Sequence, residues 1–583
     1  MNVLLIHSED DPERGPWSDL RWDRVVDLGL GGANSYARWG ERFRCPVSTL
    51  DSLRTGFRDF YKIRELMDLG CGRLTDAYGL DWWELISIMV PEELERLVLL
   101  MRFARSLSPG QEVWVSRPGL HANILQCLLP GRVRVFPWGR RAKRSGLGHY
   151  VRVANKFSSA QLIEIFWDKY DSGHQFRGRF AAERPPSDRP VVLLPTAYVN
   201  VSRTGIAYAN TFPELNFLLV ATRQSGWLND LPRNVTAARI SSYASLGDRP
   251  AENLDLENRW RSLLEELKSV EEFELFSRLG CLDNFPRYFR HGIEVRDAWR
   301  NVLDREPVQS VLCGDDSNPY TRIPLLLAQK RGMSNISCHH GALDGRFVFK
   351  RCYADTIWAR GKMEEDYLVR KCGVPREKVE ICAPSLPETW RGTEREKYDS
   401  SGRHILFISE VYEVSGGRTE EFYRDVLPPL AELGLATGRE LIVKLHPGEN
   451  QRERTALVDR VLSAKQRRAA RVVSGPLTED LFRSAWFGIT VLSTVAMECA
   501  VRGIPCFLCK WFECWSYGYV DQFIRFEIGM GLNHPSEIAN IPELLSRYAG
   551  NPNVAANCWE PAGPRHLREL SGASRNAFAE AAR

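Results

Sequence analysis

The chain has 583 residues, of which 44% are hydrophobic and 26% charged. This length is well past the roughly 250 to 300 residues at which one hydrophobic core stops growing, so we expect at least two domains, and the composition excludes disorder, collagen and a coiled coil. The 78 basic and 74 acidic residues leave a net charge of +4. This near balance gives no reason to expect a general attraction to nucleic acid, and we expect no nucleic-acid partner.

No stretch of the sequence is typical of a membrane span or a secretory signal. The most apolar candidate, Ser484–Met497, is shorter than the roughly 20 residues a spanning helix needs, and Met1–Asp11 lacks a basic start and runs into acidic residues. The 14 cysteines are scattered, which is typical of reduced core thiols. We therefore expect a cytoplasmic protein. A peripheral contact with the inner membrane stays open.

Short apolar runs alternate with amphipathic stretches of helical length, the pattern of strand–helix units that build a parallel sheet. A first series of strands is predicted over Asn2–His7, Glu112–Ser116, Val133–Pro137, Pro190–Pro195, Asn216–Ala221, Gln309–Cys313, Asn335–Cys338 and Thr356–Ala359. A second series is predicted over His404–Ser409, Glu440–Leu445, Ala470–Val473, Gly488–Leu492 and Pro505–Cys509. Helices are predicted over Pro91–Ser108, Tyr320–Arg331, Thr419–Leu433, Gln451–Ser463, Glu479–Ala485 and Val495–Arg502. The predicted fold class is α/β.

A polar stretch separates the two series. Residues 384–403 hold prolines, glycines, serines and alternating charges with no apolar period, so residues 387–403 are predicted to be a linker. We therefore predict two Rossmann-like domains facing across a cleft: residues 1–386 with insertions on the acceptor side, and residues 404–583 as the donor-binding domain. A basic run, Arg140–Arg144, is interpreted as a solvated loop, with an anionic partner as the alternative.

The first candidate site follows the predicted strand that ends at Cys313. Ligands of open parallel sheets gather at the carboxyl ends of the strands, and Asp315 and Asp316 lie there. A carboxylate at this edge could act as general base on an acceptor hydroxyl, and its like-charged neighbour would raise the pKa of one of the two. The structural alternative is that Asp316 or Ser317 only caps the next helix.

The second candidate site is the turn His339-His340-Gly341, which follows the next predicted strand. An imidazole at this edge can serve as a base or donate to a phosphate, and a glycine lets the backbone approach a ligand closely. A zinc site is less favoured, because no second ligand cluster stands at metal spacing, and we expect no metal site.

The third and fourth candidate sites lie in the second series. A strand delivers Lys444 and His446 two residues apart, on one face, and Pro447 ends it. Later, a strand gives way to a helix at Ser493-Thr494, where hydroxyl and backbone N–H groups suit an anion, and Glu498 lies one turn into that helix, within reach of a ribose hydroxyl. The alternative is that Ser493 is only an N-cap.

The order and spacing of these motifs resemble a known family. Lys444-Leu445-His446-Pro447, followed by Ser493-Thr494, Glu498 and Gly503-Ile504-Pro505, resemble the donor-domain motifs of GT-B glycosyltransferases of the bacterial sialyl-, polysialyl- and Kdo-transferase type. The CDP-glycerol glycerophosphotransferases are similar as well, through the His-Gly turn and the Lys-x-His-Pro strand. The resemblance covers about residues 310–510.

The resemblance implies a role for each motif. The donor would be bound by His446, Ser493, Thr494 and Glu498, with Lys444, Pro447, His339 and Gly341 beside it, while Asp316 or Asp315 would be the base and His340 would face the reacting centre. The implied activity is metal-independent transfer of a sugar, most simply from a CMP-activated acidic donor, to a cell-surface or capsular glycan or glycolipid, with no cofactor besides the nucleotide sugar. Three alternatives stay open: a CDP-polyol phosphotransferase, a nucleotide-sugar epimerase, and a non-catalytic scaffold in polysaccharide export.

Overall fold

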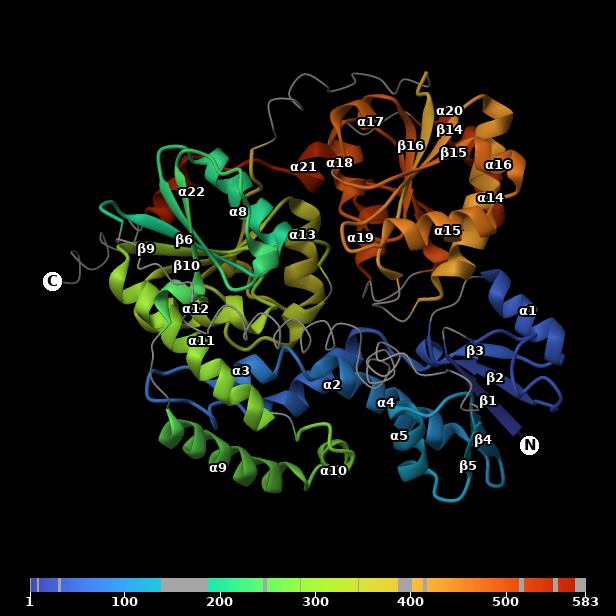
Figure 1. Cartoon of the computed structure of the whole chain (residues 1–583), viewed down its shortest axis with the longest axis horizontal. Helices are drawn as coiled ribbons and strands as arrows, with labels where there is room; N and C mark the ends of the chain where they lie inside the picture. Colours follow the sequence, from blue (N-terminus) through green and yellow to red (C-terminus); the bar gives the residue numbers. More distant parts are fainter. Residues whose placement is uncertain are drawn as a thin grey trace. The chain divides into compact units, whose positions relative to one another are not determined.

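A computed structural model of the chain contains three parallel β-sheets flanked by helices (Figure 1). It describes residues 2–7, 10–29, 33–137, 187–244, 249–283, 285–343, 345–385, 401–412, 417–475, 477–512, 518–548 and 554–571. The basic run Arg140–Arg144 and most of the predicted linker lie outside the described residues. No described helix is both long enough and apolar enough to cross a membrane.

The first sheet has five strands in the order β3-β2-β1-β4-β5, all parallel. The strands are β1 (Asn2–Ile6), β2 (Arg24–Asp27), β3 (Val47–Thr49), β4 (Glu112–Val115) and β5 (Val133–Val135), and the accompanying helices are α1 (Ala33–Phe43) and α5 (Leu120–Leu128). Its core is aromatic, because buried Trp17, Trp22, Trp39 and Phe136 pack with the apolar side chains of β1 and β2.

The second sheet has seven parallel strands in the order β12-β11-β10-β9-β6-β7-β8. The strands are β6 (Val191–Thr196), β7 (Asn216–Ala221), β8 (Val235–Arg239), β9 (Val308–Cys313), β10 (Ser334–Ser337), β11 (Thr356–Ala359) and β12 (Val379–Ile381). Its unit contains the helices α2 (Phe57–Asp68), α3 (Trp82–Ile86), α8 (Val199–Thr211), α9 (Pro250–Leu267), α10 (Glu271–Arg278), α11 (Phe285–Arg305), α12 (Pro319–Lys330), α13 (Lys362–Asp366) and α22 (Pro564–Leu570).

The third sheet has six parallel strands in the order β15-β14-β13-β16-β17-β18. The strands are β13 (His404–Ile408), β14 (Glu440–Lys444), β15 (Ala470–Val473), β16 (Ala485–Thr490), β17 (Cys506–Cys509) and β18 (Met530–Leu532). Its helices are α14 (Thr419–Thr437), α15 (Gln451–Val461), α16 (Ala464–Arg468), α17 (Glu479–Arg483), α18 (Val495–Val501), α19 (Tyr519–Arg525), α20 (Ile541–Ser546) and α21 (Val554–Cys558).

All three sheets repeat one topology. If each sheet's strands are numbered from its own first strand, the order begins 3-2-1-4-5, which is the Rossmann order. From the first strand of each sheet, the next strands along the chain are added on one side and the later strands on the other. This reversal of strand order lies between β1 and β4, between β6 and β9, and between β13 and β16. Because ligands of doubly wound sheets bind outside the carboxyl ends of the strands at such a reversal, each sheet has one defined place to search for a site.

The compact units of the chain differ from the predicted domain boundaries. One unit contains residues 1–55, 97–162 and 387–558, and the other contains residues 56–96, 163–386 and 559–583, so helix α4 (Pro91–Ser106) belongs to both. The strands predicted within residues 1–386 therefore form two sheets, and the five-stranded sheet groups with the C-terminal one. The chain changes unit near residues 55, 96 and 558, and again between residues 137 and 187 and between residues 385 and 401.

The last segment of the chain returns to the seven-stranded sheet, where α22 (red) lies beside the green strands (Figure 1). The hydroxyl of Ser310 donates to the carbonyl of Leu570 at 2.6 Å, and the indole N–H of Trp358 donates to the Glu569 carboxylate at 3.2 Å. These bonds explain why residues after 559 belong to this unit rather than to the unit of the preceding helix α21.

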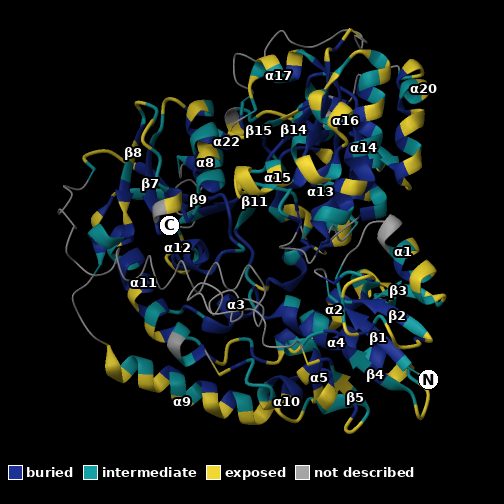
Figure 2. Cartoon of the chain, turned by 45° about the vertical axis from the view of Figure 1, so that its right-hand side comes forward, coloured by how far each residue is buried: buried dark blue, intermediate teal, exposed yellow. Residues whose placement is uncertain are grey.

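Burial follows the predicted elements. The strands are mostly buried, whereas the outer faces of α9, α15 and α20 are exposed (Figure 2). Every predicted strand and helix named above is confirmed within a few residues. The prediction missed β2, β3, β8, β12 and β18, of which all but β2 are short strands at a sheet edge, where a half-exposed run carries a weak apolar signal.

Candidate active site

At the reversal of the seven-stranded sheet, a tyrosine and an aspartate meet. Tyr198 follows β6 and Asp315 follows β9, and the Tyr198 hydroxyl donates a hydrogen bond to Asp315 Oδ2. Asp315 is 3% exposed, and its Oδ1 accepts from the backbone N–H of Ser317 at 3.0 Å. The ring of His340 packs edge-on against Tyr198, with a centroid distance of 5.7 Å. The structure thus joins two predicted residues through a tyrosine that the sequence analysis missed.

Asp316 is placed differently, inside a buried ion-pair network. Lys350 Nζ contacts its Oδ1, and Arg322 Nη1 lies 3.4 Å from its Oδ2. Arg322 also pairs with Glu84 at 2.9 Å, and all four side chains are nearly inaccessible. Burial acts to raise the pKa of the Asp316 carboxyl, but Lys350 and Arg322 outweigh burial and hold it below its usual range.

The prediction that repulsion between the two aspartates raises a carboxyl pKa is therefore wrong for Asp316. Lys350 and Arg322 contact this carboxylate, and their proximity could not be predicted from the residues adjacent in sequence. A carboxylate enclosed by Lys350 and Arg322 is suited to holding these elements together. Of the two aspartates, Asp315 has the hydrogen-bond partner and the position suited to proton transfer.

The two histidines in the turn after β10 differ in their hydrogen bonds. His339 Nε2 bonds to the carbonyl of Ala342 at 2.8 Å, which fixes its ring within the turn. His340 is half-buried, and its Nδ1 is buried without a hydrogen-bond partner among the described residues. The Gly341 carbonyl accepts from Arg360 at 2.6 Å, and, apart from the adjacent residues, no atom of the described chain lies within 4 Å of the position that a Cβ would take there. Packing therefore does not require this glycine.

At the reversal of the six-stranded sheet, Ser409 and Glu410 follow β13 and link the two loops that the sequence analysis singled out. The Ser409 hydroxyl donates to Glu449 Oε1 at 2.8 Å, and the His446 backbone N–H donates to Glu449 Oε2 at 2.7 Å. On the other side, Thr490 Oγ1 and the Leu492 backbone N–H donate to Glu410 Oε1 at 2.8 and 2.7 Å. The His446 loop and the turn before Ser493 are thus tied to one short segment.

The residues after β14 differ in accessibility. Lys444 is 5% exposed, and its Nζ donates to the Leu445 carbonyl at 2.5 Å, so its ammonium is held against the backbone. His446 is half-buried, and its Nδ1 accepts from the Gly448 backbone N–H at 3.0 Å, so a neutral His446 carries its proton on Nε2. Pro447 is exposed. Of these three, His446 can present a donor at the sheet edge.

The three candidate residues after β16, Ser493, Thr494 and Glu498, are half-buried. The Ser493 hydroxyl accepts from the Val495 backbone N–H at 3.3 Å, so the capping interpretation holds in part. Thr494 occupies the N-cap of α18 without a side-chain cap bond. Glu498 lies on α18 at 3.9 Å from Arg502. The expectation that Ser493 and Thr494 stand where a strand ends and a helix begins is confirmed.

Glu410 is the most unusual group at this edge. Its carboxylate is bonded by N–H and O–H donors alone, and within the described chain no Lys or Arg forms an ion pair with it. Burial raises the pKa of the Glu410 carboxyl, while the bonds from Leu492, Thr490 and the neighbouring backbone lower it in part. The turn at residues 490–492 therefore already binds one anion, and that anion belongs to the chain itself.

The sequence analysis missed Tyr198, Ser409, Glu410 and Glu449. Tyr198, Ser409 and Glu410 each stand within two residues of the end of a buried strand that was predicted, so the same rule, applied to every strand, would have found them. Glu449 follows Lys444-Leu445-His446-Pro447 closely but is not at a strand end. Its role is visible only through its bonds to Ser409 and His446.

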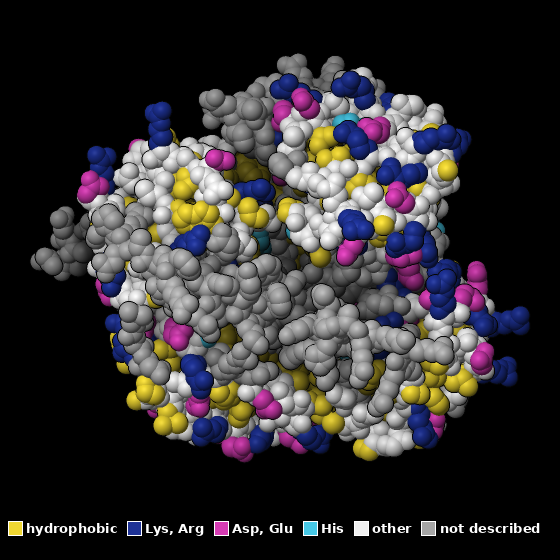
Figure 3. All heavy atoms as spheres, viewed as in Figure 1, with side chains coloured by type: hydrophobic (Ala, Val, Ile, Leu, Met, Phe, Trp, Pro, Cys, Tyr) yellow, Lys and Arg dark blue, Asp and Glu magenta, His cyan; other side chains and the backbone are white. Residues whose placement is uncertain are grey.

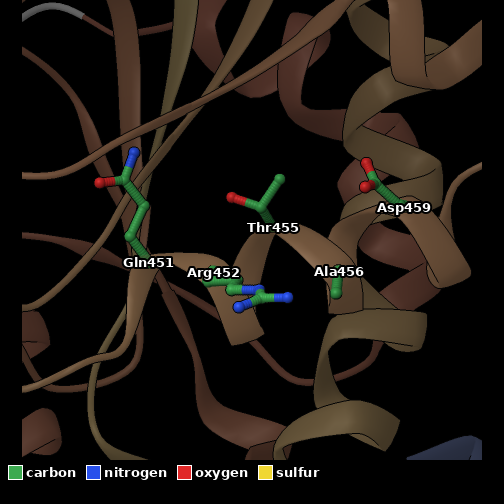
Figure 4. Close-up of a pocket in the computed structure, with 5 residues that line it drawn as sticks. All are labelled: Gln451, Arg452, Thr455, Ala456 and Asp459. Carbon is green, nitrogen blue, oxygen red and sulfur yellow. The ribbon is translucent and has the colours of Figure 1, made fainter.

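Two other features of the surface do not add to these sites. A hollow on α15 is lined by Gln451, Arg452, Thr455, Ala456 and Asp459 (Figure 4), none of which is a predicted site residue. On the described part of the face shown in Figure 3, Lys and Arg side chains are scattered among Asp and Glu side chains. Among the described residues, no group of three or more His, Cys, Asp or Glu side chains is arranged to hold a metal ion.

No protein-family model and no curated protein matches the chain. Among solved structures, the chain is similar to a putative UDP-N-acetylglucosamine 2-epimerase from Listeria monocytogenes (TM-score 0.40, 11% identity, 68% of this chain and 97% of that one). A second similar structure is a glycosyltransferase from Rickettsia africae, with a TM-score of 0.38 and 10% identity, covering 67% of this chain and 97% of that one. A third is the wall teichoic acid polymerase TagF, with a TM-score of 0.34 and 10% identity, covering 76% of this chain and 100% of that one. At these scores the similarities do not decide an activity.

Proposed function

We propose that the chain is a glycosyltransferase that uses a nucleotide-activated sugar. The observation that carries the proposal is at the order reversal of the six-stranded sheet, where Ser409 and Glu410 tie the His446 loop to the turn before Ser493. A Rossmann-ordered sheet binds nucleotides at this position, and histidine, serine and backbone N–H groups are donors that phosphate accepts.

In this proposal the donor's phosphates bind between His446 and Ser493-Thr494. His446 Nε2 and the two hydroxyls donate hydrogen bonds to the phosphates, and the Glu498 carboxylate accepts a hydrogen bond from a ribose hydroxyl. As the bond from the sugar to the phosphate breaks, negative charge collects on the phosphate, and donors already in place stabilise it more than water would. We propose that these groups suffice without a divalent metal and without a further cofactor.

The seven-stranded sheet supplies the base in this proposal. Asp315 accepts the proton of the acceptor hydroxyl, and Tyr198 orients the carboxylate through its hydrogen bond. His340, whose Nδ1 has no hydrogen-bond partner in the described part of the chain, packs against Tyr198. Asp316 keeps a positioning role, because Lys350 and Arg322 enclose it. A CMP-activated acidic sugar as donor and a capsular or cell-surface glycan as acceptor rest on the motif resemblance.

A ligand screen tests the proposal. We expect CMP or CDP to raise the melting temperature of the full chain more than UDP or GDP, since a ligand that binds the native state stabilises it by mass action. His446→Ala should weaken the preferred nucleotide about tenfold, as expected for a hydrogen bond to a charged group. His534→Ala is the matched control, because His534 is an exposed histidine of the same unit.

Two outcomes would count against the proposal. If no nucleotide shifts the melting temperature, the nucleotide site fails; if His446→Ala and His534→Ala bind equally well, the assignment of His446 fails. Metal independence is checked separately by turnover in EDTA, which we expect to leave the rate unchanged. The product separates the activities: glycosyl transfer from a CMP-sugar supports the proposal, whereas polyol phosphate transfer from CDP-glycerol replaces it with the phosphotransferase alternative.

A further inference from the structure

The five-stranded sheet has the same strand-order reversal as the other two, and a histidine and a serine meet there. His7 follows β1 and Ser116 follows β4, the two strands between which the order reverses. His7 Nδ1 lies 2.9 Å from Ser116 Oγ, within hydrogen-bond distance. The backbone already pairs these strands, because the Ser116 N–H donates to the Leu5 carbonyl at 2.9 Å. The side-chain bond is therefore not needed to join β1 to β4.

The imidazole of His7 is neutral and accessible in part. Burial, followed by the charges of Arg117 and Arg418, lowers the pKa of His7 to about 4. Ser116 is fully buried and His7 is half-buried, and the ring of His121 on α5 packs edge-on to His7 at a centroid distance of 5.6 Å. With Nδ1 bonded to Ser116, Nε2 is the remaining polar atom of the ring, and no described residue bonds to it.

The cations around His7 are each balanced by a carboxylate. Arg117 Nε lies 2.7 Å from Asp10 Oδ1. Arg418, which comes from the loop after β13, lies 3.0 Å from Asp27 Oδ2 and also donates to the His7 carbonyl at 2.6 Å. The edge therefore has little net positive charge to attract an anion, and it offers neutral hydrogen-bonding groups instead. Such groups match the hydroxyls of a saccharide or polyol.

We propose that this edge of the five-stranded sheet is a second ligand site, which binds a hydroxyl-rich saccharide or polyol through His7 Nε2, with Ser116 orienting the imidazole. A ligand hydroxyl would satisfy the ring nitrogen to which no described residue bonds, and a polar atom of a half-buried side chain gains from such a bond. This inference does not depend on the proposed function, because the sheet and its residues are separate from those assigned to the donor and the base.

The test uses the full chain and three small probes: glycerol, galactose and N-acetylglucosamine. Saturation-transfer NMR should show binding of at least one probe, with affinity about fivefold weaker in His7→Ala and in Ser116→Ala, as expected for a lost hydrogen bond. The controls are His534→Ala and Ser536→Ala, because His534 Nδ1 and Ser536 Oγ form a similar pair at 2.8 Å that is exposed. Both controls should bind like the wild type.

A second measurement locates the site without any variant. Hydrogen exchange of the wild-type chain should slow in the peptides that contain residues 3–7 and 112–122 when the bound probe is present. The inference is overturned if no probe binds, if binding is equal in His7→Ala and the controls, or if protection falls elsewhere. It is also overturned if inorganic phosphate displaces the probe, because the site would then be an anion site.

Discussion

Two carboxylates that follow buried strands, the fully buried Asp316 in the seven-stranded sheet and the half-buried Glu410 in the six-stranded sheet, show how differently one sequence pattern can be used. Each follows closely after a buried strand. Asp316 is enclosed by Lys350 and Arg322, and its pKa is lowered. Among the described residues, Glu410 is bonded only by N–H and O–H donors, and its pKa is raised.

The difference shows that the partners of a carboxylate outweigh the extent of its burial, because the more buried group, Asp316, has the lowered pKa. Cations compensate the cost of removing Asp316 from water, so its charge is retained and the network becomes structural. At Glu410, hydrogen-bond donors offset the cost of burying the charge only in part, so this carboxylate binds a proton more readily than a carboxylate in water. Glu410 lies at the edge of the sheet where we propose that phosphate binds. The comparison predicts stability effects at Asp316 and binding effects at Glu410.

The largest expected effect tests the ion-pair side of the comparison. Lys350→Ala leaves Asp316 with one cation fewer in a fully buried place, and we expect unfolding in urea to show a loss of about 3 to 5 kcal/mol. Arg471→Ala is the control, since it removes an exposed pair with Glu440 and should cost under about 1 kcal/mol. Equal losses in the two variants would show that Asp316 does not need its cations.

The second prediction separates the adjacent aspartates by turnover. Asp315→Asn keeps the shape of the side chain but removes the proposed base, so we expect turnover with the preferred donor to fall at least about 100-fold while the melting temperature changes little. Asp316→Asn should mainly lower the melting temperature, because Lys350 and Arg322 lose their counter-charge. The opposite pattern would make Asp316 the base.

The third prediction removes the charge at Glu410. Glu410→Gln keeps an oxygen that can accept from Leu492 but no longer repels a phosphate, so we expect CMP or pyrophosphate to bind about tenfold tighter at neutral pH by calorimetry. The control is Glu440→Gln, because Glu440 is an exposed carboxylate of the same domain. Weaker binding in Glu410→Gln would mean that the carboxylate itself contacts the ligand.

The smallest expected effect is a pH dependence of stability that has opposite signs at the two carboxylates. A lowered pKa means that Asp316 stabilises the fold above its unfolded pKa and loses this contribution as pH falls through its folded value. A raised pKa means that charged Glu410 destabilises the fold at neutral pH. Glu410→Gln should therefore melt above the wild type near neutral pH, and the difference should vanish in acid; a constant difference would contradict this.

Much of the fold could be predicted because apolar runs are local signals. Strands such as Asn216–Ala221 and Glu440–Lys444 are almost wholly buried, and their sequences show it. The rule that ligands gather at the carboxyl ends of strands selected His446, Ser493 and Asp315, and all three residues do follow the carboxyl end of a strand. The partition into units could not be predicted, since residues 1–55 and 97–162 group with the C-terminal sheet through contacts distant in sequence.

The sequence by itself determined the α/β class, the buried strands and the polar residues that follow them, because each depends on the order of residues along a short segment. Only the tertiary structure decided which acid is paired with cations, that Tyr198 reaches Asp315, and that Ser409 and Glu410 connect two loops. The physical reason is that pKa values and hydrogen bonds depend on distances of a few ångströms between segments up to hundreds of residues apart, as Arg322 and Glu84 illustrate.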